Sequence, residues 1–173
     1  DADGDTLSVD SLSATNGSLT ETPIEGTWTF TPNADYNGTV DLTYNVVDGN
    51  GGSVAATKAF NLQSVNDLPE LTGQQATLAN GTEDTSYTIN ASDLLQGYSD
   101  VESDTLSVDS LSATNGSLTD NNNGTWTFTP NADYNGTVDL TYNVVDQDGG
   151  SVAATQSFNL QAVNDAPELT GQQ

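Results

Sequence analysis

The stretch Thr137-Val138-Asp139-Leu140-Thr141-Tyr142-Asn143-Val144-Val145 decides the fold class, and the same nine residues stand at positions 39–47. Apolar and polar residues alternate along it. Because an extended chain turns successive side chains to opposite faces, the apolar ones share one face: Val138, Leu140, Tyr142 and Val144. This alternation, with its threonines and valines, predicts a β-strand that has one buried face and one solvent face.

An internal repeat extends this pattern along the chain. Residues 6–20 return unchanged at 105–119, and residues 27–48 return unchanged at 125–146. The offset drops from 99 to 98 between these blocks, because the turn at 120–124 is one residue shorter than the turn at 21–26. A turn that accepts such a change is expected at the surface. The sequence therefore predicts tandem copies of one structural unit.

The second copy is whole and holds seven segments with strand patterns. They lie at residues 70–78, 85–90, 105–113, 116–119, 125–129, 137–145 and 151–161. A short helical turn is expected over residues 91–97, where it would bury Leu94 and Leu95. Trp126 and Phe128 are expected to face inward as core anchors. With Asn-Gly and Gly-Gly turns and no sustained helical periodicity, the sequence predicts an all-β fold of tandem, immunoglobulin-like, seven-stranded β-sandwich repeats joined end to end.

A recurring joint separates the expected domains. Val65-Asn66-Asp67-Leu68-Pro69-Glu70-Leu71 returns 98 residues later with alanine in place of leucine at Ala166, and its proline keeps the preceding residue extended. We expect residues 1–66 to be the last five strands of one repeat, 67–165 a complete repeat and 166–173 the start of the next. The chain is then a piece of a longer array, since it also lacks an initiator methionine.

The first copy is incomplete, and we expect this to lower its stability. Without its first two strands it should expose apolar surface and unpaired strand edges. We therefore expect it to be unstable alone, unless another chain or a neighbouring repeat supplies those strands.

Composition excludes several classes of function. The net charge is −24, with Lys58 as the one basic residue against 25 acidic ones, and the chain has no histidine, cysteine or methionine. Disulfides and thiolate metal sites are therefore excluded, and so is the usual histidine base. One lysine cannot neutralise a phosphate backbone, so nucleic acid is not expected as a partner. No apolar run approaches the roughly 18 residues of a membrane span, so membrane insertion is not expected either.

The acidic residues gather in loops at the two ends of the predicted sandwich. At one end lie Asp100, Glu102, Asp104, Asp146 and Asp148, with Asp1, Asp3, Asp5 and Asp48 as their counterparts in the first copy. At the other end lie Glu83, Asp84 and Asp133, with Asp35 as the counterpart of Asp133. Each joint would run between the Glu83-type acidic end of one repeat and the Asp100-type acidic end of the next. The joint residues are Asn66 and Asp67 in the first joint and Asn164 and Asp165 in the second.

Such a junction suits calcium, which takes six to eight hard oxygen ligands. Without a cation, carboxylates about 4–6 Å apart would raise one another's pKa or force the ends apart. Asp, Asn and Gly are also common turn formers, and single motifs of this kind are ordinary in loops. Five separate acidic elements converging on one junction favour Ca²⁺ binding.

These motifs together resemble a known family. The Val-Asn-Asp-x-Pro-Glu-Leu joint, Glu83-Asp84-Thr85, the acidic triplet at 100–104 and the Val-Val-Asp-x-x-Gly-Gly turn resemble the cadherin-like tandem repeats of giant bacterial surface adhesins, including VCBS-type repeats of RTX-type adhesins. The resemblance implies a cadherin-like β-sandwich extender, calcium at the joints, and secretion to the cell surface. The Gly-Gly-x-Gly-x-Asp nonapeptide of the RTX β-roll is absent.

The resemblance also implies roles for individual residues. Asn66 and Asp67 match the linker ligands of cadherins, and Asp100 with Glu102 matches the acidic pair of the following domain. That pair is usually Asp-x-Asp, so Glu102 departs from the pattern. Glu83 matches the acidic residue near the first strand that serves the following joint.

We therefore expect a structural, non-catalytic repeat that contacts adjacent repeats of its own chain and holds a distal ligand-binding region away from the cell. Two alternatives stay open. In the first, loop aromatics at Tyr98 and Tyr134 bind a polysaccharide. In the second, strand edges or acidic ends pair between chains in homotypic association. Enzyme activity is not expected, because nothing in the sequence marks a pocket with an acid and a base in different environments.

Overall fold

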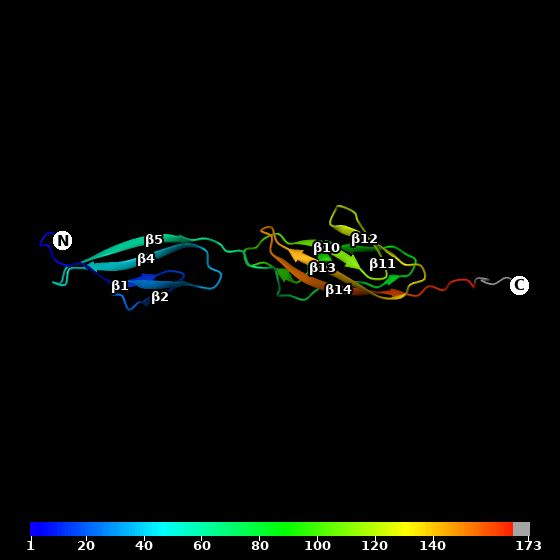
Figure 1. Cartoon of the computed structure of the whole chain (residues 1–173), viewed down its shortest axis with the longest axis horizontal. Helices are drawn as coiled ribbons and strands as arrows, with labels where there is room; N and C mark the ends of the chain where they lie inside the picture. Colours follow the sequence, from blue (N-terminus) through cyan, green and yellow to red (C-terminus); the bar gives the residue numbers. More distant parts are fainter. Residues whose placement is uncertain (168–173) are drawn as a thin grey trace. The chain divides into compact units, whose positions relative to one another are not determined.

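The computed structural model describes residues 1–167 and divides the chain into two compact units, Asp1–Val65 (unit 1) and Asn66–Gln173 (unit 2). Figure 1 labels the longer strands of both units where there is room. No helix in the described part of the chain is long and apolar enough to span a membrane. Residues 168–169 of the second joint lie outside the described residues, as does most of the expected start of a third repeat.

Unit 2 is built from two main antiparallel sheets. One contains β10 (Ser107–Ala113), β13 (Gly136–Val145) and β14 (Ser151–Gln161), with β7 (Gly81–Thr82) added in parallel beside β14. The other contains β11 (Gly116–Asp120), β12 (Thr125–Pro130) and β8 (Tyr87–Asn90). The helix α1 (Ala91–Leu94) follows β8, and β6 (Glu70–Leu71) pairs with β9 (Tyr98–Ser99). The expected all-β sandwich is therefore confirmed.

The core of unit 2 lies between these two sheets. The four alternating apolar side chains of β13 are at most 3% exposed: Val138, Leu140, Tyr142 and Val144. Phe158 of β14 meets Phe128 of β12 edge to face, with ring centroids 5.5 Å apart, and this contact joins the sheets. Trp126 packs against the same core and is partly buried. The predicted inward faces of β12 and β13 are thus the observed ones.

The helix α1 closes one side of this core. Leu94 is fully buried, and Leu95 packs against the core from a partly buried position, so the short helical turn is confirmed. The hydroxyl of Tyr142 donates to the carbonyl oxygen of Leu94 at 2.9 Å. Burial, with the nearby Tyr98, raises the pKa of Tyr142 to about 12, so this phenol keeps its proton well beyond neutral pH.

The single strand predicted over residues 70–78 is wrong. Only Glu70 and Leu71 pair, and the backbone N–H groups of Thr72 and Gly73 then donate to the carbonyl of Gly97. Gly73 lies against the backbone of Gly97, where a side chain would be tight. The chain pairs again at β7, which begins at Gly81 of the Asn80-Gly81 pair. Glycine, alanine and asparagine have low β-propensity, which allows the strand to break between the two sheets.

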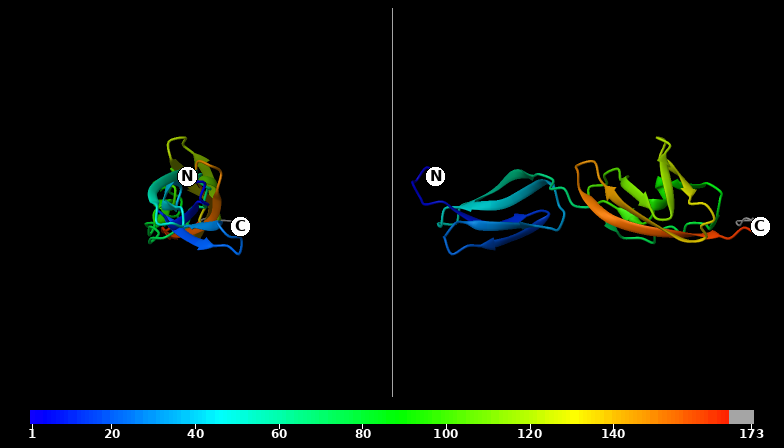
Figure 2. Two further views of the ribbon diagram at one scale, coloured as in Figure 1. Left: turned by 90° about the vertical axis from the view of Figure 1, so that its left-hand side faces the viewer. Right: turned by 45° about the vertical axis from the view of Figure 1, so that its right-hand side comes forward.

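Unit 1 repeats five of these strands in the same register. β1 (Ser8–Ala14), β4 (Gly38–Val47) and β5 (Ser53–Leu62) form one sheet, and β2 (Gly17–Glu21) with β3 (Trp28–Pro32) forms the other. The cyan strands β4 and β5 lie side by side in Figure 2. Val40 faces Phe60 across β4 and β5, as Val138 faces Phe158 across β13 and β14.

The burial of unit 1 differs although its sequence is nearly the same. Phe60 is 37% exposed, whereas its counterpart Phe158 is 4% exposed. Leu7 and Val54 are also exposed, whereas their counterparts are packed against the core of unit 2. The expected exposure of apolar surface is therefore confirmed. The instability expected of the incomplete copy stays a prediction.

The two copies give a matched pair of core substitutions. Leu140→Ala removes a fully buried side chain and should lower the free energy of unfolding of unit 2 by about 2–5 kcal/mol. Leu42→Ala changes the same position in the open unit 1, where the side chain is only partly buried, and should cost less. Denaturant unfolding followed by residue-resolved NMR separates the two units, and equal losses would contradict the burial difference.

Candidate metal centre

The first acidic cluster lies at the end of unit 2 where β9 leads into β10 and β13 leads into β14. Asp100 Oδ1 accepts the backbone N–H groups of Glu102 and Asp104 at 2.9 and 3.2 Å. Asp146 Oδ1 accepts those of Asp148 and Gly150 at 2.9 and 2.7 Å. The Oδ1 oxygen of each aspartate therefore holds the backbone of its own loop, and the Oδ2 oxygen is left for other partners.

The preceding joint is bonded into this cluster. The side-chain amide of Asn66 donates to Asp146 Oδ2 at 3.1 Å, and the backbone N–H of Asp67 donates to Glu102 Oε2 at 3.2 Å. Gly150 is required beside them, since a Cβ there would clash with the Asp146 carboxylate and lie 2.9 Å from the Asn66 amide nitrogen. The structure thus brings the seven predicted residues to one end of unit 2: Asn66, Asp67, Asp100, Glu102, Asp104, Asp146 and Asp148.

The electrostatics of this first cluster fit a cation. Asp100 Oδ2 and Asp104 Oδ2 are buried and have no hydrogen-bond partner among residues 1–167. Burial raises the pKa of Asp104, and the negative charges of Asp148, Asp100, Asp146 and Glu102 raise it further. Buried carboxylate oxygens without a donor are unfavourable unless a positive charge accompanies them. The residues present therefore suit the hard oxygen ligation that calcium requires.

The pKa of Asp104 is raised, whereas that of Asp146 is lowered. Burial alone would raise its pKa, but hydrogen bonds from the Asn66 amide and from the Gly150 and Asp148 backbone outweigh that effect and lower it. Asp146 therefore stays ionised beside Asp104, and the cluster keeps a negative charge that a cation can neutralise.

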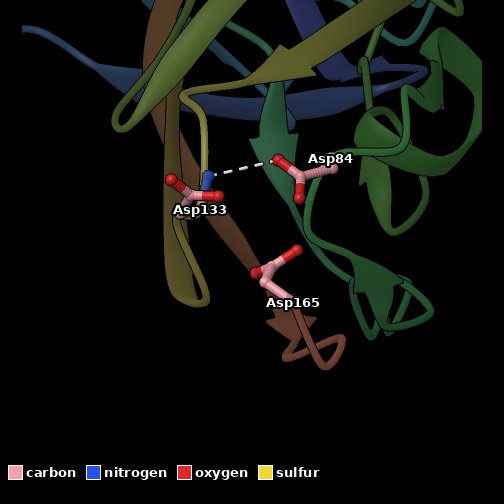
Figure 3. A group of neighbouring side chains, drawn as sticks. All are labelled: Asp84, Asp133 and Asp165. Carbon is pink, nitrogen blue, oxygen red and sulfur yellow. Dashed lines mark hydrogen bonds between the residues drawn. The ribbon is translucent and has the colours of Figure 1, made fainter. Parts of the chain in front are cut away.

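The second cluster lies at the opposite end, where β7 leads into β8, β12 leads into β13, and the chain leaves β14. Asp84, Asp133 and Asp165 each offer a carboxylate oxygen within 4.8 Å of the others, and all three residues are exposed. Figure 3 shows these side chains together, with Asp84 Oδ1 accepting the backbone N–H of Asp133 at 3.1 Å. Partial desolvation, with the charges of Asp133, Asp84 and Glu83, raises the pKa of Asp165.

Glu83 holds the outgoing joint beside this second cluster. It is 3% exposed, and its Oε1 accepts the backbone N–H of Val163 at 2.6 Å. Its Oε2 accepts the side-chain amide of Asn135 at 3.1 Å. The sequence analysis did not single out Asn135, which stands in an Asn-Gly pair of the kind expected in turns. Its position two residues after Asp133 was the available signal, because both sit in the loop opposite Glu83.

The remaining predicted metal ligands make hydrogen bonds within their own unit or are exposed. In unit 1, the backbone N–H of Asp3 donates to Asp1 Oδ1 at 2.7 Å, and Asn50 donates to Asp5 Oδ2 at 2.8 Å. The pKa of Asp48 is lowered by hydrogen bonds from the Asn50 and Gly52 backbone. Asp35 and Asn164 are exposed, and the Asn164 amide donates to the carbonyl of the next residue.

The loop position predicted for Tyr98 is wrong, whereas Tyr134 lies in the loop between β12 and β13 as predicted. Tyr98 belongs to β9, and both side chains pack against the core in partly buried positions. The hydroxyl of Tyr134 donates to the carbonyl of Thr137 at 2.7 Å, which fixes its ring across the turn. These aromatic faces therefore serve packing.

The fold and both end clusters agree with what comparison of the sequence shows. The chain belongs to the cadherin-like domain family, whose model matches residues 1–63 and 65–161. Domains of this family are typically non-enzymatic and typically bind calcium, and membership indicates an extracellular, adhesion-type repeat.

A solved cadherin structure supports the fold. The chain is similar to repeats EC1-2 of human mucin-like protocadherin, with 16% identity, a TM-score of 0.52, and coverage of 91% of this chain and 84% of that one. It also aligns with an endo-fucoidan hydrolase of glycoside hydrolase family 107 at 23% identity and a TM-score of 0.41, covering 94% of this chain and 24% of that one. The chain thus spans about a quarter of that enzyme's length. No curated protein matches it.

The raised pKa of Asp104 predicts the pH dependence of the calcium-free protein. Its folded pKa lies above the value of about 3.9 expected in the unfolded chain, so its contribution favours folding at low pH and is lost as pH rises through the folded value. The melting temperature in chelator should therefore fall between pH 4 and pH 7. Asp104→Asn should flatten this fall and raise the melting temperature at pH 7, whereas Asp139→Asn removes the same charge from an exposed strand position and should not flatten it.

The contacts of Glu83 predict a local effect at the second cluster. Glu83→Ala removes the acceptor for the Val163 N–H and the Asn135 amide, and leaving such donors unpaired costs about 1–3 kcal/mol. We expect faster hydrogen exchange at the Val163 amide and lower stability of unit 2. Glu70→Ala, an exposed glutamate in β6, is the matched control. Unchanged exchange at Val163 would show that Glu83 does not hold the joint.

Proposed function

We propose that this chain is a calcium-stiffened extender of a secreted bacterial surface adhesin of the RTX type, which holds a distal ligand-binding region away from the cell. The observation that carries the proposal is the bonding of each joint into an acidic cluster. Asn66 and Asp67 enter the first cluster and Asp165 enters the second, at opposite ends of the same sandwich.

The physical mechanism follows from charge. Without a cation, the buried Asp100 and Asp104 oxygens repel each other, and so do the three carboxylates of the second cluster. A bound Ca²⁺ would offset this repulsion and draw the joint aspartates, Asp67 and Asp165, onto the ends of the sandwich. A joint held this way loses its freedom to hinge. At free calcium about 100-fold above Kd, each site would stabilise the folded state by about 2.7 kcal/mol.

The residues of each site can be proposed by role. In the first cluster, Asp100 and Asp104 would ligate through their unpartnered oxygens, and Asp67, Glu102, Asp146 and Asp148 would complete the shell. In the second cluster, Asp84, Asp133 and Asp165 would ligate, with Glu83 holding the backbone. We propose the same use for the unit 1 residues in an array of adjacent repeats: Asp1, Asp3, Asp5, Asp35 and Asp48.

The rigid element between the two clusters is β13. Its ten residues run beside β14 without a break, from Gly136 opposite Leu160 to Val145 opposite Ser151. At about 3.4 Å per residue, this ladder spans roughly 30 Å. A repeat of this kind keeps its two joints at a fixed separation, which is what an extender needs.

The test is thermal unfolding of the chain with millimolar Ca²⁺ and with chelator, together with small-angle scattering on the same samples. Calcium should raise the melting temperature of unit 2 and give a less flexible particle. Asp100→Asn should reduce this response because it neutralises a ligand with an unpartnered oxygen, whereas Asp139→Asn should keep it.

Magnesium at equal ionic strength separates site binding from screening of the −24 charge. Equal stabilisation by both ions, or an unchanged melting temperature in calcium, would reduce the acidic clusters to surface charge and remove the proposed mechanism.

A further inference from the structure

An extra residue interrupts the pairing of β10 with β13 in unit 2. The ladder pairs Asp109 of β10 with Asn143 of β13. The next pair is Ser112 with Thr141, so two residues of β10 stand opposite Tyr142 alone. Such a two-against-one arrangement is a β-bulge, which bends the strand and increases its local twist. In unit 1, β1 carries the same irregularity against β4.

The extra residue is a serine in a backbone conformation that favours glycine. The φ angle is 54° at Ser110 and 56° at its counterpart Ser11. Residues with a Cβ atom seldom adopt this left-handed region, because the Cβ comes too close to the following carbonyl oxygen. The Ser110 hydroxyl donates to Asp109 Oδ2 at 2.8 Å, and Ser11 makes the same contact with Asp10 at 2.9 Å. Both copies therefore keep an unfavourable conformation inside a strand.

Burial of the core does not require this extra residue. Val108, Leu111 and Ala113 of β10 pack against the core of unit 2, whereas Ser110 is exposed. If Ser110 were absent, these three apolar residues would occupy alternate positions of a regular strand and would share one face. A strand shorter by one residue could therefore bury the same side chains. The bulge needs another explanation, and the second edge of β10 offers one.

The bulge lies in a strand at the edge of its sheet. The sheet order in unit 2 is β10, β13, β14 and β7, so β10 has β13 as its one strand partner among residues 1–167. This edge is present although β7, β8 and α1 close the sandwich of unit 2. An edge strand carries unpaired N–H and C=O groups and is a template for another strand. Bulges are common at such edges because they end or misalign the ladder.

Repetition makes this edge a particular hazard for the chain. The strands β1 and β10 have the same seven residues, Ser-Val-Asp-Ser-Leu-Ser-Ala, and each chain carries both. Identical strands match in length and alternation, so two such edges are suited to pair with each other. The bulge breaks the regular row of backbone groups that such pairing needs. Asp109 is exposed and adds a charge at the same point, which a second edge would repeat.

We propose that the bulge at Asp109–Ser110 prevents the free edge of β10 from pairing with the same edge of a second copy of this chain. The edge is a self-complementary interaction surface, and the extra serine keeps it irregular. Removal of that serine leaves the buried face of β10 intact and makes the edge a continuous strand. The inference goes beyond the proposed extender function and does not depend on calcium.

The test is deletion of Ser110 in the full chain, in chelator and 0.15 M salt, where repulsion between acidic chains is screened. Sedimentation over a range of concentrations should show association at least about tenfold tighter than in the unchanged chain. Amide exchange in β10 should slow by at least about tenfold in the associated form, because exchange then requires release of the paired strand. The matched control is Ser110→Gly, which keeps the extra residue and suits its φ angle. This control should associate no more tightly than the unchanged chain.

A second variant, Ser110→Val, keeps the chain length but disfavours the left-handed conformation, because valine is β-branched. It should also raise association and protect β10, and it decides the question if the deletion variant does not fold. A folded variant of either kind that associates no more tightly than the unchanged chain overturns the proposal. Association without protection of β10, or equal association of the glycine control, also overturns it. If neither variant folds while the glycine control does, the bulge is a requirement of folding and the proposal fails.

Discussion

The packing of Phe158 between the two sheets of unit 2 is the interaction on which the rest of the structure depends. Its ring stacks on Tyr87 and meets Phe128 edge to face, so one side chain of β14 contacts both β8 and β12 of the opposite sheet. In unit 1 the same phenylalanine, Phe60, keeps only the edge-to-face neighbour and is 37% exposed. In unit 2 the sandwich is therefore closed by β7, β8 and α1, and hydrophobic burial follows from that closure.

The closed sandwich fixes the acidic loops at its ends. β13 and β14 pair over ten residues, which holds the loop of Asp146 and the loop of Asp133 a fixed distance apart. In each cluster, some carboxylate oxygens accept hydrogen bonds from loop N–H groups. The remaining carboxylate oxygens have no donor or lie beside another acidic side chain. Negatively charged carboxylates therefore repel one another at the two ends of the sandwich, where the joints attach. A cation is the simplest group that removes this repulsion without changing the fold.

Much of this was predictable from local sequence. Alternation along residues 137–145 gave the buried face of β13, and the order of the strands placed the acidic loops at two ends. Low β-propensity after Leu71 allowed a break, but the place of the break depends on the contact of Gly73 with Gly97 across 24 positions, which the sequence does not show. The role of Asn135 was missed for a similar reason, since its partner Glu83 lies 52 residues away. Periodicity reports which face a residue takes, whereas pair contacts between distant loops leave no periodic signal.

The two copies also show where sequence stops determining environment. Residues 27–48 and 125–146 are identical, and their strands pair in the same register, yet Tyr142 is 3% exposed while Tyr44 is only partly buried. Backbone pairing is therefore a property of the strand itself and its hairpin neighbours. Burial is a property of the whole sandwich, because it needs a segment distant in the chain.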